Sequence, residues 1–135
     1  MSGLFGAIGI TGTGIDAAQT WIDTTAGNLA NMNDTVSPAQ GAYQQQTPVF
    51  TPLVGATGQG DGVAVSSVQL GSAIGTLVYD PTNPQANAQG MVRQPAISMS
   101  TQLVQLVQAQ NDYQANTVAF KRALTAYQSA LTLGS

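Results

Sequence analysis

Cysteine, histidine and glutamate are absent from this chain of 135 residues, in which every acidic residue is Asp. Their absence excludes zinc sites built on Cys or His, disulfide scaffolds, and catalysis by a thiolate or an imidazole. Charged residues make up only 7% of the chain, with three Lys or Arg against six acids and a net charge of −3. Because nucleic-acid backbones are bound by clustered basic residues, we expect no nucleic-acid partner.

Long apolar runs are missing as well. The best candidate, residues 3–10, is far shorter than the ~20 apolar residues of a membrane span and has no basic residue before it, unlike a signal peptide. We therefore expect a glycine-loosened helix start and no membrane insertion. Hydrophobic residues account for 43% of the chain, but many are Ala, and small side chains bury little area. The isolated chain is expected to be marginally stable.

The N-terminal segment carries a helical pattern from Leu4 to about Asn33. Apolar or small residues alternate at spacings of four and three, which predicts a helix with a heptad seam, most secure from Ile15 onward. Asn31 and Asn33 are predicted to cap its C-terminal end before Pro38. The seam consists of Leu4, Ile8, Thr11, Ile15, Ala18, Ile22, Thr25 and Leu29.

The middle of the chain, about residues 34–97, contains all six prolines and many glycines, which excludes long helices. Turn-forming residues gather in it and separate short runs of strand-forming ones. The Gly-rich stretch lacks the Lys-Ser/Thr that completes a phosphate loop, so we predict a small β insert with mobile loops. The predicted strands are 48–50, 63–68 and 76–79; the turns are 80–84 and 88–90; the loops are about 37–47 and 54–62.

A second helical pattern runs from about Ser98 to Leu133 without Pro or Gly. A helix of some 35 residues spans roughly 50 Å, more than one small domain needs, which indicates packing against something outside the chain. Its seam has strict three-four spacing: Leu103, Leu106, Gln110, Tyr113, Thr117, Phe120, Leu124, Tyr127 and Leu131.

These patterns predict a mainly α fold with a small β insert, in which the two terminal helices pair as a coiled-coil-like hairpin. We expect the helices of an axial core domain in 1–36 and 98–135, and the β-rich insert in 37–97. Outside the seams the helices carry Gln, Asn, Ala, Ser and Thr, whose faces lose little desolvation energy when covered. This favours a structural subunit of a packed assembly; a soluble hairpin with a Gln-rich surface is the alternative.

No catalytic, cofactor or metal site is predicted. Asp16 and Asp23 share a helix face but lie roughly 10 Å apart, too far for a cooperating carboxylate pair. In so uncharged a chain the few charges are candidate intersubunit contacts: Asp16, Asp23, Asp112, Lys121 and Arg122. Trp21 and Tyr127 are expected to be packing residues. The predicted helix–helix and assembly interface comprises Ile8, Ile15, Ile22, Asn28, Leu29, Asn31, Leu103, Leu106, Tyr113, Phe120, Leu124, Tyr127 and Leu131.

Asn28 and Asn31 are three residues apart, so both amides lie on one side of the last helical turns. Each could cap free carbonyls or bond to another helix. We interpret the pair as a clamp that fixes the register of the hairpin or of a subunit contact, with simple capping as the alternative.

Several segments resemble the axial proteins of the bacterial flagellum. Residues 26–31, Ala-Gly-Asn-Leu-Ala-Asn, are similar to the signature that ends the N-terminal helix of rod and hook proteins, and 113–116 and 131–134 resemble their closing helix. Residues 77–92 resemble a segment typical of the FlgC family of rod proteins. The chain departs from that pattern at Gly27, Met91 and residues 96–97.

The resemblance implies a non-enzymatic, cofactor-free subunit of the proximal rod of the basal body, which polymerises through its terminal helices into the torque-transmitting shaft used for motility. It implies export by the flagellar type III apparatus without a cleaved signal peptide, into the rod that spans the periplasm. The partners it implies are further copies, other proximal and distal rod proteins, the hook–basal-body adaptor and the MS ring. A secreted helical-hairpin binding or effector protein is the alternative function.

Overall fold

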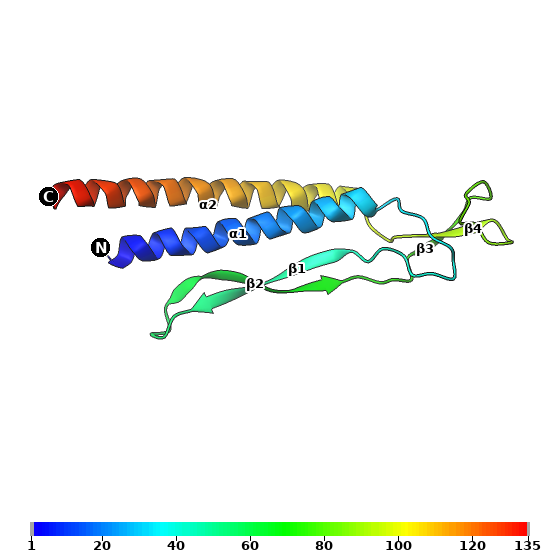
Figure 1. Ribbon diagram of the computed structural model, residues 1–135, viewed down its shortest axis with the longest axis horizontal. Coiled ribbons are helices and arrows are strands. Elements are labelled where there is room, and N and C mark those ends of the chain that lie inside the picture. The colour runs from blue at the N-terminus through cyan, green and yellow to red at the C-terminus, as the bar shows by residue number, and fades with distance from the viewer. Residues whose placement is uncertain (1, 135) are drawn as a thin grey trace. The chain divides into compact units, whose positions relative to one another are not determined.

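The computed structural model describes residues 2–134. In this part of the chain a long helix precedes four strands and a second long helix follows them (Figure 1). The elements are α1 Ser2–Asn31, β1 Gln46–Val54, β2 Gly60–Leu70, β3 Thr76–Tyr79, β4 Met91–Gln94 and α2 Met99–Leu133. The predicted fold class, two paired terminal helices with a small β insert between them, is confirmed.

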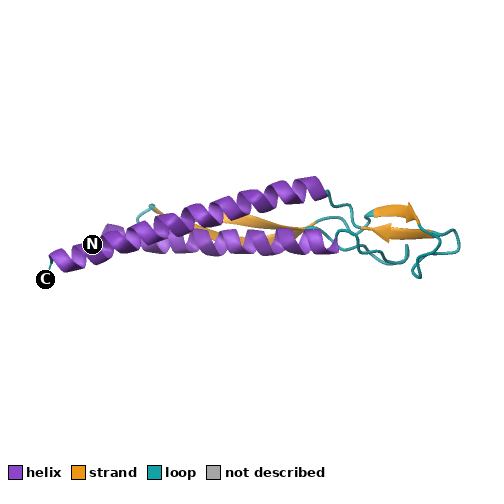
Figure 2. Ribbon diagram, turned by 90° about the horizontal axis from the view of Figure 1, so that it is seen from above, coloured by secondary structure: helices purple, strands orange, loops and turns teal. Residues whose placement is uncertain are grey.

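The strands form two separate two-stranded sheets, β1 with β2 and β3 with β4 (Figure 2). The three predicted strand segments all lie in strands. The loop predicted at 54–62 is wrong in extent, because β1 continues to Val54 and β2 begins at Gly60, so only 55–59 connects them. Gly58 in this turn has φ +80°, which glycine adopts without steric cost.

Strand β4 was not predicted from the sequence. Its four residues, Met91–Gln94, include a single β-branched side chain and two polar ones, so propensity alone does not favour a strand. It is held by pairing on both edges: Tyr79 of β3 lies opposite Met91, and Val36 exchanges two backbone hydrogen bonds of 2.9 and 2.8 Å with Arg93. Tertiary pairing therefore creates this strand.

The chain divides into two compact units, each containing part of both helices and part of the middle segment. Unit 1 consists of Met1–Ile22, Pro48–Ser67 and Val107–Ser135; unit 2 consists of Asp23–Thr47 and Val68–Leu106. The division into an axial core and an insert stays a prediction.

In unit 1, α1 lies between α2 and the β1–β2 hairpin (Figure 1). Buried Gly14 faces the amide of Asn116 on α2. Toward the hairpin, the rings of Trp21 and Phe50 meet edge to face at 5.8 Å. Near the N-terminus of α1, Phe5 contacts Tyr127 of α2, with ring centroids 4.6 Å apart. Trp21 and Tyr127 are therefore packing residues, as expected.

In unit 2, the helix ends are defined by side-chain hydrogen bonds. Asn31 donates from Nδ2 to the carbonyl of Gly27, one turn earlier in α1, at 2.7 Å. The predicted cap by Asn33 is wrong, because its side chain accepts a bond from Gln94 at 3.2 Å instead. At the start of α2, Ser98 Oγ accepts from the backbone N–H of Thr101 at 3.4 Å, as an N-cap does.

Candidate assembly surface

The buried line of α2 matches the predicted seam at one of its two heptad positions. Leu106, Tyr113, Phe120 and Tyr127 are half-buried. At the other position the contact line lies one residue earlier than predicted, so that Leu103, Leu124 and Leu131 are 47%, 37% and 46% exposed. The residues that line the contact there are smaller or polar: Gln102, Ala109, Asn116, Ala123 and Ala130.

On α1 the predicted seam residues Ile8, Ile15, Ile22 and Leu29 are all half-buried. The most buried side chains on this helix are smaller: Ala17, Ala18, Thr24, Thr25 and Asn28. Small or polar residues therefore occupy the most buried positions on both helices. A prediction based on hydrophobicity favours large apolar side chains, so it misses these small and polar residues.

Asn28 is the centre of a buried hydrogen-bond network in unit 2. It is 1% exposed, and its Nδ2 donates to Gln46 O at 2.8 Å and to Gln102 Oε1 at 2.9 Å. Its Oδ1 accepts from the Gln46 backbone N–H at 2.8 Å and from the Tyr43 hydroxyl at 3.2 Å. One amide thus joins α1, β1, α2 and the loop before β1, whereas Asn31 bonds to its own helix.

Gln102 completes this network and was missed by the sequence reasoning. It is fully buried, and its Nε2 has no partner among the described residues. Its position four residues before Leu106 is compatible with the same face of the helix and could have indicated its burial. A pattern based on hydrophobicity places the neighbouring Leu103 there instead.

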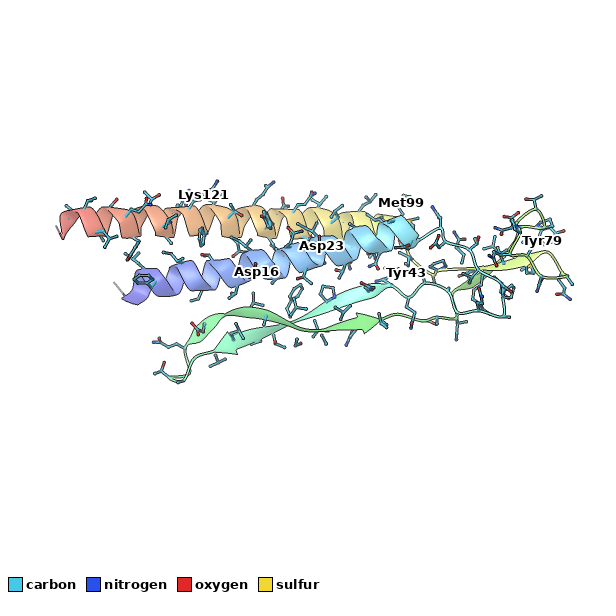
Figure 3. All side chains as sticks on the ribbon, viewed as in Figure 1. Asp16, Asp23, Tyr43, Tyr79, Met99 and Lys121 are labelled. Atoms are coloured by element: carbon cyan, nitrogen blue, oxygen red, sulfur yellow. The ribbon has the colours of Figure 1, made fainter. Side chains whose placement is uncertain are left out.

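The predicted intersubunit charges, Asp16, Asp23, Asp112, Lys121 and Arg122, are all exposed on the two helices. Figure 3 shows Lys121 on the edge of α2 that faces away from α1. The remaining basic residue, Arg93, donates to the carbonyls of Ile74 and Pro38. Because Arg93 is held within its own loop region, Lys121 and Arg122 are the cations available at the surface.

The described residues hold no group of three or more Cys, His, Asp or Glu that could bind a metal ion. A hollow of about 470 Å³ in unit 1 is lined mainly by apolar and small residues, among them Trp21 and Phe50, with Asp112 as its one charged group. One carboxylate without a nucleophile or a second carboxylate beside it supplies no acid–base pair. This hollow therefore has the character of a packing surface.

Large apolar side chains are exposed on both units. On α2 they include Val104 in unit 2 and Val107 and Val118 in unit 1, at 58%, 56% and 49% exposure. Exposed apolar residues grouped on an element mark interaction surfaces. Between residues 2 and 134 no helix is long and apolar enough to span a lipid bilayer.

Comparison with known proteins assigns the chain to a family. No family model matches it, but it is similar over nearly its whole length to curated proteins named flagellar basal-body rod protein FlgC. The protein from Salmonella typhimurium is 33% identical over 93% of both chains. Those from Borreliella burgdorferi and Bacillus subtilis are each 28% identical, over 97% of both chains for the first and 96% of this chain for the second. The chain belongs to the FlgC family of flagellar basal-body rod proteins.

Proposed function

We propose that this protein is a structural subunit of the flagellar basal-body rod, assembled through its terminal helices. The observation that carries the proposal is the similarity to rod proteins over 93–97% of the chain. The exposed neutral faces of α2 support it, because amide, hydroxyl and methyl groups can be covered without stranding charges.

The finer parts of the proposal concern position and partners. We place the subunit in the proximal rod, in contact with further copies, other proximal and distal rod proteins, the hook–basal-body adaptor and the MS ring. Export by the flagellar type III apparatus without signal cleavage fits the glycine-rich start of α1, which weakens the isolated helix. Folding would then be completed on assembly, where burial against neighbours offsets the ordering entropy.

The proposed function is non-enzymatic. Asp16 and Asp23 are both exposed on α1, and the relatives are rod proteins by name. The alternative of a secreted effector has no observation in its favour.

Complementation tests the proposal. Deletion of this gene from a motile strain of the source bacterium should abolish swimming, and swimming should return when the full chain is supplied. A chain lacking its last ten residues should not restore swimming, because it loses the end of α2. Isolated basal bodies should contain the full chain by immunoblot. Normal swimming without the gene, or absence of the chain from basal bodies, would overturn the proposal.

A further inference from the structure

A groove runs along the N-terminal half of α1 in unit 1. It has a volume of about 480 Å³ and lies between Gly3, Gly6, Ala7 and Ile10 on one side and the β1–β2 turn on the other. It adjoins the hollow of about 470 Å³ beside Trp21, since Ile10 and Gly60 line both. We call the part bounded by residues 3–10 and 55–61 the α1 groove.

The fold of the chain itself does not require glycine in this groove. A Cβ atom added at Gly3 or at Gly6 would meet nothing within 4 Å, although each glycine costs up to about 1 kcal/mol relative to Ala inside a helix. Gly14 differs, because a Cβ there would run into the Asn116 side chain. The open space at Gly3 and Gly6 is therefore available to something outside the chain.

One line along α2 of unit 1 exposes two large apolar side chains. Val107 and Val118 are 56% and 49% exposed, and their separation of eleven residues places them on one line of the helix, three turns apart. Lys121 and Arg122, both exposed, follow within about one turn. We call residues 107–122 of this line the α2 ridge.

The charges of the two surfaces are complementary. Asp61 is the charged residue that lines the α1 groove, and the groove contains no base. The α2 ridge ends in the two surface cations, Lys121 and Arg122, and the third base, Arg93, is engaged by backbone carbonyls. An exposed ion pair adds only about 0–1 kcal/mol, but charge complementarity fixes register and excludes wrong pairings.

We propose that the α2 ridge of one copy docks in the α1 groove of a second copy of this chain, with Lys121 and Arg122 beside Asp61. The inference rests on the proposed function and gives it a residue-level contact. Because the two surfaces differ, the contact is heterologous and extends from copy to copy, as a rod requires. The glycines permit the valines to approach the α1 backbone closely.

The natural absence of cysteine permits a direct test by cross-linking. Two tagged full-length chains, one with Gly6→Cys and one with Val118→Cys, are co-expressed in the deletion strain, and purified basal bodies are oxidised mildly. We expect a disulfide-linked pair that carries both tags. Gly9→Cys with Val118→Cys is the matched control, because Gly9 is exposed on α1 and does not line the groove; it should give at least tenfold less product.

Outcomes separate this contact from the function on which it rests. Basal bodies that contain both chains but yield no Gly6–Val118 cross-link would overturn the docking and leave the rod function intact. Basal bodies that contain neither chain, while unmodified protein is also absent from them, would overturn the proposed function itself.

A second measurement separates docking from helix stiffness. Gly6→Ala and Gly9→Ala both favour the helix equally, but only Gly6→Ala fills the groove. We expect Gly6→Ala to reduce swimming severalfold and Gly9→Ala to leave it unchanged. Equal effects of the two substitutions would contradict docking, because they would show that the glycines act through helix flexibility.

Discussion

Within the two units of this protein, different kinds of internal contact hold the elements together. Unit 2 buries polar side chains, and Thr25, Asn28 and Gln102 are all nearly inaccessible to solvent. Unit 1 buries Ala17, Ala18 and Ala109 and relies on two aromatic pairs, with an open groove beside α1. Unit 2 combines buried polar side chains with the buried apolar residues Val92 and Ala42, whereas the buried side chains described in unit 1 are small and apolar.

This difference indicates that unit 2 is important mainly for the folding of the chain, and unit 1 mainly for its assembly. Buried amides are stable where their hydrogen bonds are made within the structure. The amide of Asn28 meets this condition in unit 2, whereas Gln102 Nε2 has no partner among the described residues. The side chains of the buried alanines in unit 1 need no hydrogen-bond partners. This unit also exposes the α1 groove and the α2 ridge. We therefore expect substitutions in unit 2 to act mainly on folding, and surface substitutions in unit 1 to act mainly on assembly.

The largest expected effect is that of Asn28→Leu in unit 2. It removes four hydrogen bonds and leaves the backbone N–H and C=O of Gln46 and the side-chain oxygen of Gln102 without this partner. Each buried group left unpaired costs about 1–3 kcal/mol, so the free energy of unfolding should fall by about 4 kcal/mol in urea denaturation. Asn31→Ala, which loses a single bond within α1, is the control and should cost about 1 kcal/mol. Similar losses for both would contradict the central role of Asn28.

Two glycine-to-alanine substitutions, Gly75→Ala in unit 2 and Gly6→Ala in unit 1, should change the free energy of unfolding in opposite directions. Gly75 in unit 2 has φ +56°, and a Cβ there would collide with the backbone oxygen of Gln94 and with Ala42. Left-handed strain and overpacking together should lower the unfolding free energy by about 3 kcal/mol for Gly75→Ala. Gly6→Ala in unit 1 should raise it by about 0.5–1 kcal/mol. Thermal unfolding by circular dichroism measures both, and a destabilising Gly6→Ala would show that unit 1 has no free space there.

Within unit 1 the aromatic contact should be the main intramolecular anchor. Trp21→Ala removes the half-buried ring that meets Phe50 edge to face, and we expect a loss of about 2 kcal/mol. Trp21→Phe retains a ring at this place and should cost less than half as much. If Trp21→Ala changed urea unfolding by less than about 0.5 kcal/mol, the hairpin would not depend on this contact.

The hydrophobic periodicity of the sequence and the positions of its prolines and glycines were sufficient to predict the overall architecture. The proline-free stretch after Ser98 predicted α2 to within one residue, and the prolines and glycines bounded the β insert. Residues 77–92 and 26–31 carried the family resemblance, which the comparisons confirmed. These features are local, so a single chain displays them without knowledge of its contacts.

The contacts themselves were harder to predict, because small and polar residues form them. The pairing of β4 with residue 36 depends on residues more than fifty positions apart, and no propensity encodes it. The Asn28 network was expected only as a clamp of unknown partner, since Gln46 and Gln102 become its neighbours through folding. In a protein of an assembling family, large apolar side chains can also serve outward contacts, which displaces the seam that hydrophobicity predicts.

The smallest expected effects, those of substitutions at Gln102 and Leu103, test whether the contact line on α2 lies one residue earlier than the predicted seam. Gln102→Ala removes the oxygen that accepts from Asn28 and leaves a gap at a fully buried site, so it should lower the unfolding free energy by about 1.5 kcal/mol. Leu103→Ala truncates a side chain that is 47% exposed and should cost less than about 0.5 kcal/mol. The hydrophobic seam read from the sequence requires the reverse order, because it places Leu103 inside and Gln102 outside. Urea midpoints of the two variants, measured side by side, decide which of the adjacent residues faces α1.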